Sequence, residues 1–313
     1  MGKIGRLDAA HLALMLGALT LSYVLPFELL LLSYAVLGPA HYLTEISWLH
    51  DRSYFLPHRN LALILAGIAI VALFTSHPGT YGALVWLALI GSVLASAPAS
   101  RLQRFVAAVL ALCATALLIA SPEAFAITGT LLPTIIHVSL FTFIFMWSGA
   151  MKSRSPVQFA LVAMYLVSFA AILIAPPSEK TTIPMLASLS TYYFGGVAPA
   201  LGSVIGVPHL QFDARIAGLL SFVYTYHYLN WFVKAEVIRW NRIPKQRAIA
   251  IAVLSAAATG CYLYDYTLGF TVLLSLSLMH VLLEFPLNAI SIRQLGESFV
   301  GSKPVRSGRR KAA

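Results

Sequence analysis

The chain has 313 residues, of which 59% are hydrophobic and only 10% are charged, and its mean hydropathy is +0.82. A soluble domain has about 25% charged residues, so this composition excludes an ordinary soluble protein and predicts a helical membrane protein. The formal net charge is +10, but the basic residues lie between apolar segments and at both ends, as in cytoplasmic loops, which argues against nucleic-acid binding.

Ten apolar segments are long enough for membrane-crossing helices, which need about 20 residues each. We therefore expect an all-α fold, a polytopic transmembrane helical bundle that forms a single integral membrane domain over residues 1–301. Residues 302–313 are expected to be a disordered basic tail. The predicted spans are 9–25, 27–49, 60–76, 81–98, 104–121, 124–149, 156–175, 212–236, 247–264 and 268–290.

Residues 177–211 are apolar but are interrupted by several glycines and prolines. If this segment crossed the membrane, the basic loop from Arg239 to Arg247 would lie outside, against the positive-inside rule. We therefore predict a re-entrant or outer-surface segment, since irregular backbone at membrane depth must be covered by protein or water. Both termini are then cytoplasmic, and we expect an integral protein of the bacterial inner membrane.

Four histidines in four different predicted spans lie at a similar depth. Counted from the outer end of each span, the depths are roughly 21 Å for His41, 20 Å for His137, 22 Å for His227 and 18 Å for His280. Polar side chains at this depth are costly and usually face a partner or a bound ion. The shared level predicts one metal site with four imidazole ligands. His209, 18 residues before His227, is expected at the outer surface or in the re-entrant segment.

Three further polar residues follow these histidines at helical spacing. Glu45 and Glu284 each lie four residues after a histidine, on the same helix face, and Asn230 lies three residues after His227. Such groups can accept the second ring N–H of a metal-bound imidazole. The two glutamates can also be ligands themselves, which gives four His and two Glu for two ions, or they can form purely structural buried contacts.

A site made of imidazoles suits Fe, Zn, Cu or Ni, and a catalytic ion keeps open positions for water, oxygen or substrate. Neutral imidazoles leave Fe(II) its full charge and room for dioxygen, and an apolar bundle can admit a lipophilic substrate from the membrane lipids. Aromatic residues near the histidines are candidates to line such a cavity: Tyr42, Trp48, Tyr224, Tyr226, Tyr228 and Trp231.

Four short stretches resemble the Brp/Blh-like membrane β-carotene dioxygenases, in the same order along the chain. They are GPAHYLTE (38–45), IH (136–137), YHYLNWFV (226–233) and MHVLLEF (279–285). The resemblance implies that His41, His137, His227 and His280 bind Fe(II), and that the protein cleaves a polyene oxidatively to retinal-type aldehydes. The chain departs from the family pattern at Tyr42, where the family has Gly, and at Glu45, where it has Asp. Around His227, it also lacks the family's second histidine four residues away.

The sequence therefore predicts a membrane-embedded, dioxygen-using iron oxygenase with a lipophilic substrate. A di-iron hydroxylase or desaturase with four His and two Glu is the nearest alternative. A haem-binding electron-transfer protein would use histidines in axial pairs. A transporter would use the glycine- and proline-rich segment and the intramembrane glutamates as its pathway.

Overall fold

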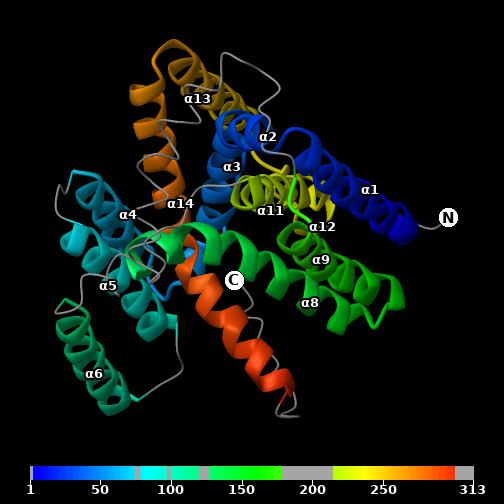
Figure 1. Ribbon diagram of the computed structural model, residues 1–313. Helices are drawn as coiled ribbons and strands as arrows, with labels where there is room; N and C mark the ends of the chain where they lie inside the picture. The colour runs from blue at the N-terminus through cyan, green and yellow to red at the C-terminus, as the bar shows by residue number, and fades with distance from the viewer. Residues whose placement is uncertain (1–2, 75–77, 97–99, 120–126, 178–213, 300–313) are drawn as a thin grey trace.

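A computed structural model describes residues 3–74, 78–96, 100–119, 127–177 and 214–299. Every regular element within these ranges is a helix, and together the helices form a bundle (Figure 1). The re-entrant segment predicted at 177–211, the basic tail, His77 and His209 fall outside the described residues, apart from the first residue of that segment.

The helices follow the predicted spans closely. The first part of the chain forms α1 (Lys3–Val24), α2 (Pro26–Leu32), η1 (Ser33–Leu37), α3 (Gly38–His50), η2 (Ser53–Phe55), α4 (Asn60–Leu73), α5 (Pro78–Ser96) and α6 (Arg101–Ile119). The second part forms η3 (Ile127–Phe141), α8 (Thr142–Ser153), α9 (Pro156–Ile174), α11 (Ala214–Val233), α12 (Ala235–Ile238), α13 (Lys245–Tyr264) and α14 (Tyr266–Phe299).

The predicted number of ten spans is larger than the structure supports. Within the described residues, six helical stretches are long and apolar enough to cross a membrane: Leu7–Val24, Pro26–His50, Pro133–Ser153, Pro156–Ile174, Lys245–Tyr264 and Tyr266–Glu297. Helix α4 has only 14 residues, about 21 Å, against a hydrocarbon core of about 30 Å. Helix α11 is not among the six, and it carries Arg215, His227 and Asn230 within 20 residues. Because many of its side chains are buried in the bundle, it does not need a uniformly apolar surface.

Helices α3 and α11 lie near the middle of the bundle, with α4, α5 and α6 on one side and α1, α8 and α9 on the other (Figure 1). Helix α14 packs against α3, α4, α5 and α13, and α11 packs against α1 and α2. The apolar core is divided accordingly. One large cluster joins α3, α4, α5 and α14 around Leu49, Ala69 and Leu282, and a second joins α1, α8, α9 and α11 around Met15, Tyr165 and Phe222. A smaller third cluster contains Ala35, Ala258 and Leu273.

Two stretches of π-helix precede or contain predicted site residues. The five residues of η1 lead directly into α3, and the amide of Gly38 bonds back to the carbonyl of Ser33, five residues earlier. The longer η3 contains Pro133 and His137. Pro39 and Pro133 lack the N–H that an α-helix needs, so a local change of hydrogen-bond pattern is expected near both prolines. Short π-helical stretches inside α-helices are frequent at functional sites.

Candidate metal centre

The four histidines that were predicted to lie at one depth are side by side in the structure, between the two larger apolar clusters. His41 comes from α3, His137 from η3, His227 from α11 and His280 from α14. The distance between ring centroids is 4.8 Å for His41–His227, 5.4 Å for His41–His280, 5.6 Å for His137–His280 and 6.0 Å for His137–His227. All four rings are buried. Each of the four imidazoles thus lies next to two of the others, in a closed cycle.

The nitrogen atoms of two of these rings face each other directly. Nε2 of His227 lies 3.1 Å from Nε2 of His41. Two neighbouring ligands of one ion, each at about 2.1 Å, are separated by about 3.0–3.4 Å in octahedral or tetrahedral geometry. The distance is therefore that of two nitrogen atoms that point at one common ion, although a neutral pair can also share a single N–H proton.

Both glutamates approach the histidines from inside the cluster. Oε2 of Glu45 lies 3.1 Å from Nε2 of His41, the same atom that faces His227. Oε2 of Glu284 lies 3.2 Å from Nε2 of His137. Two groups of candidate ligands result, His41–Glu45–His280 and His137–His280–Glu284, and in each the ligand atoms lie within 4.8 Å of one another. His280 belongs to both groups, so the two groups are adjacent, whereas His227 belongs to neither and faces the first group through Nε2 of His41.

The outward-facing nitrogen atoms of two histidines have partners that the sequence did not reveal. Nδ1 of His227 lies 2.7 Å from the hydroxyl of Thr142, and Nδ1 of His137 lies 3.5 Å from the amide of Asn288. If Nδ1 carries the proton and donates it to these side chains, Nε2 presents its lone pair to the inside of the cluster. The amide of Asn288 then accepts through Oδ1, which has no other hydrogen-bond partner.

Asn288 extends a spacing that was visible in the sequence, since it follows Glu284 by four residues as Glu284 follows His280. Thr142 left no such signal, because it lies on a different helix from His227. The contact at Nδ1 of His227 that was predicted for Asn230 is made by Thr142. None of the hydrogen bonds described for the four histidines involves Asn230, which instead lines a pocket closer to the end of α11.

Part of the predicted aromatic lining contacts the cluster. The ring of Tyr42 stacks on His280 at 4.4 Å, and its hydroxyl lies 2.6 Å from that of Tyr228. Tyr228 and Trp231 pack against His41 at 4.9 and 5.5 Å. The other three predicted residues lie further out. Tyr224 packs on Tyr34 and Tyr228, Tyr226 belongs to the apolar cluster of α9 and α11, and Trp48 contacts Trp231 and the guanidinium of Arg52.

The polar atoms of the cluster fit a cation. Within the described residues, neither Glu45 nor Glu284 contacts a lysine or arginine, although both are almost completely buried. Among the described residues, Nδ1 of His41 and Nε2 of His280 are also buried without a hydrogen-bond partner, and Nε2 of His137 and Oε2 of Glu284 have only each other, 3.2 Å apart. Buried polar groups normally have partners, and buried carboxylates normally have a counter-charge. A positive ion with open coordination positions supplies both.

The other described histidines lie away from this cluster. His50 and His58 are exposed at the end of α3 and in the loop after it, and the ring of His50 faces Asp51 at 3.5 Å. His11 is buried on α1, in the same pocket as Asn230.

Comparisons of this chain with protein-family models, with curated proteins and with solved structures find no match. The resemblance to the membrane β-carotene dioxygenases therefore depends on the four short motifs and their order, and it stays a prediction.

Proposed function

We propose that the four histidines hold a non-haem iron ion, and that the protein is a membrane-embedded oxygenase acting on a lipophilic substrate. The observation that carries this proposal is that two buried groups of candidate ligands share His280, with His227 packed against His41 and His137, and with no lysine or arginine beside the carboxylates among the described residues. Imidazole and carboxylate ligands suit Fe(II), and the absence of thiolate from the cluster disfavours softer metals.

Each residue of the cluster has a distinct part in this proposal. The four rings bind the ion, with Thr142 and Asn288 fixing the orientation of His227 and His137. Tyr42 and Trp231 cover the rings of His280 and His41 and keep bulk water away. Bound iron would supply the capacity to activate dioxygen. The apolar helices around the site favour a substrate that enters from the bilayer, and cleavage of a polyene is the reaction that the motif resemblance implies.

The orientation that we propose places both termini in the cytoplasm, in the inner membrane of a bacterium. One end of the bundle supports it. There, Arg247 at the start of α13 pairs with Asp51 at the end of α3 at 2.7 Å, and Arg52 donates to the carbonyl of Ile238 after α11. Basic residues from loops far apart in the sequence thus gather at one end, as the positive-inside rule requires. A cysteine introduced at Arg242 should be labelled only from the cytoplasmic side. Labelling from outside would contradict the proposed orientation.

A haem-binding protein fits the cluster less well. A haem held between axial histidines needs its macrocycle to pass between the two rings, and rings in edge-to-face contact at 4.8–6.0 Å leave no such gap. A transporter would need its pathway through residues 177–211, nearly all of which lie outside the described ranges.

A dinuclear centre is a second candidate, and one specific observation favours it. Glu45 and Glu284 face the inside of the cluster at the Nε2 atoms of His41 and His137, rather than the outward nitrogens where an orienting carboxylate would lie. The two adjacent groups of candidate ligands could then hold one ion each, as in a di-iron hydroxylase or desaturase.

The experiment that tests both candidates is iron analysis of purified protein, combined with its absorption spectrum under anaerobic and aerobic conditions. We expect about one iron per chain in the wild type, a much lower content in His227→Ala, and no loss in His50→Ala, whose ring is exposed. Two irons per chain would favour the dinuclear centre. Normal iron content in His227→Ala, or a haem spectrum, would end the proposal.

A further inference from the structure

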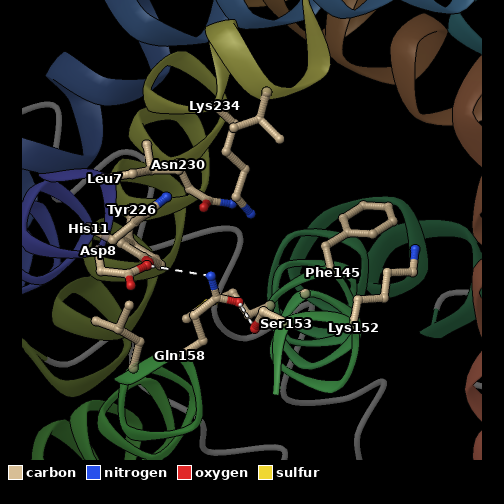
Figure 2. A pocket seen from close by; sticks show the side chains of 14 residues that line it. Leu7, Asp8, His11, Phe145, Lys152, Ser153, Gln158, Tyr226, Asn230 and Lys234 are labelled. Atoms are coloured by element: carbon tan, nitrogen blue, oxygen red, sulfur yellow. Dashed lines mark hydrogen bonds between the residues drawn. The ribbon is translucent and has the colours of Figure 1, made fainter. Parts of the chain in front are cut away.

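The pocket lined by Asn230 and His11 lies between α1, α8, α9 and α11, near the end of α11 (Figure 2). Its volume is about 390 Å³, which lies in the range of sites for small organic ligands. Most of its wall is apolar, with Leu7, Phe145, Met146, Leu161 and Val237 among the lining residues. The remaining lining side chains include a small set of polar groups, and that combination is typical of a binding site for an amphipathic molecule.

Three polar side chains that line the pocket have no hydrogen-bond or ion-pair partner for the atoms named below among the described residues. Oδ1 of Asn230 and the hydroxyl of Tyr226 are buried without a hydrogen bond, and both side chains are more than nine-tenths buried. Lys234 makes no ion pair or hydrogen bond among the described side chains. The ammonium group of Lys234, the NH2 group of the Asn230 amide and the hydroxyl of Tyr226 are donors, and at the end of an apolar pocket they can together hold an anion.

The acidic residue of the pocket is already engaged. Asp8 accepts a hydrogen bond at 3.5 Å from the amide nitrogen of Gln158, and the carbonyl oxygen of that amide accepts one at 2.9 Å from Ser153 (Figure 2). Lys152 supplies a second positive charge at the rim, where its side chain is exposed. The carboxylate of Asp8 disfavours a doubly charged phosphate, so the balance favours a ligand with a single negative charge, such as a carboxylate.

The pocket lies in line with the histidine cluster along two helices. On α11, Asn230 and Lys234 follow His227 by three and seven residues, so Lys234 is two turns further along the same face, roughly 10 Å away. On the neighbouring α8, the lining residues Phe145, Met146 and Gly149 follow Thr142 by three, four and seven residues. Thr142 is the residue that contacts His227. A ligand with its head at Lys234 can therefore extend its chain between α8 and α11 towards the cluster.

We propose that this pocket binds the carboxylate end of an amphipathic, long-chain lipid, with Lys234 and Asn230 holding the head and the chain directed at the four histidines. This inference rests on the proposed function, because it assigns a class of substrate to that centre. It also separates the chain from an enzyme for pure hydrocarbon polyenes, which have no group for Lys234 to bind.

The test is direct binding of a fluorescent long-chain fatty acid to the purified full-length protein in detergent, compared with the primary alcohol of the same chain. We expect the wild type to bind the carboxylate roughly tenfold or more tightly than the alcohol, the usual strength of a hydrogen bond to a charged group. Lys234→Met should bring the two affinities together. Lys245→Met is the matched control, because Lys245 is exposed at the start of α13, outside the pocket, and it should keep the preference.

A second variant guards against misfolding of Lys234→Met. Asn230→Asp adds a negative charge to the pocket and should selectively weaken binding of the carboxylate, while the alcohol still binds. Equal affinities in the wild type, or an unchanged preference in both pocket variants, would overturn the inference. Iron content and lipid binding of the wild type, measured together, separate the two proposals. Binding of the carboxylate by wild-type protein that contains no iron would refute only the metal centre. Bound iron without a preference for the carboxylate would refute only the lipid site.

Discussion

Nε2 of His41 and Nε2 of His227 lie 3.1 Å apart although 186 residues separate them in the chain. Helices α3 and α11 are also joined by the hydroxyl pair of Tyr42 and Tyr228 and by the hydrogen bond that Trp231 donates to Thr44, so their packing does not depend on the two imidazoles. This pair lies at the centre of the proposed iron site.

The hydroxyl of Thr142 should matter for metal affinity rather than for folding. Thr142→Val removes the contact at Nδ1 of His227 but preserves the shape of the side chain. We expect iron affinity to fall about 10–100-fold, as is usual when the partner of a ligating imidazole is lost. Affinity is measured by competition with a chelator. Thr115→Val is the control, because the Thr115 hydroxyl bonds only to the carbonyl of Ala111 in its own helix. Equal affinities in the two variants would contradict the role of Thr142.

Replacement of Glu284 by Gln distinguishes the two forms of the centre. The change removes a negative charge beside Nε2 of His137 with little change of volume. For a single ion we expect iron affinity to fall about 10–100-fold without loss of the site. Loss of one of two bound irons would instead identify Glu284 as a ligand of a dinuclear centre. Glu297→Gln on the same helix is the control, because that side chain is partly exposed and pairs only with Arg293.

Gly38 sits where a larger residue would push on the aromatic wall. A Cβ atom there would lie 3.1 Å from the hydroxyl oxygen of Tyr42 and 3.2 Å from its ring, closer than ordinary contact. Because Tyr42 stacks on His280, we expect Gly38→Ala to change the spectrum of the bound iron. Gly67→Ala in α4 meets nothing within 4 Å and should stabilise the protein by up to about 1 kcal/mol. Identical iron spectra in the two variants would contradict this prediction.

The ion pair between Asp51 and Arg247 should stabilise the fold weakly and only when Asp51 is charged. The hydrogen bond from Arg247 lowers the pKa of Asp51, so this contribution is present above the ordinary Asp pKa of about 3.9 and is lost as the pH falls through the lower folded value. Both side chains are partly exposed, so we expect Asp51→Asn to cost no more than about 1 kcal/mol at pH 7. Thermal unfolding at pH 7 and near pH 3 measures it, and a difference that grows towards low pH would be inconsistent with this account.

The sequence predicted the helices and the grouping of the four histidines well, because the constant rise of a helix converts residue number into depth. It could not predict which side chains from neighbouring helices would reach each ring. Thr142 and Asn230 illustrate the difference. Asn230 follows His227 at helical spacing, whereas Thr142 is on another helix. The packing of α8 beside α11 nevertheless brings Thr142 to the His227 ring and leaves Asn230 lining the pocket near the end of α11. The pocket itself depends on α1, α8, α9 and α11 meeting, which no local pattern encodes.

The number of spans was overestimated for a related reason. Apolar runs such as 60–76 and 81–98 predict helices, but the length of each helix is decided by where the chain turns in the bundle. Helix α4, for example, already ends at Leu73. Helix α14 is instead longer than predicted, since it continues through Pro286 to Phe299, whereas the predicted span ended at residue 290.

The π-helical turn of η1 has a consequence for how this centre could have arisen. One extra residue in a helical turn rotates everything that follows by about 100° around the axis. Deletion of a single residue between Ser33 and Leu37 would return the stretch to α-helical hydrogen bonding and turn His41 and Glu45 together away from His227 and His280. A bundle of the same overall shape could therefore lose or acquire its ligands through one codon, without any change to the histidines themselves.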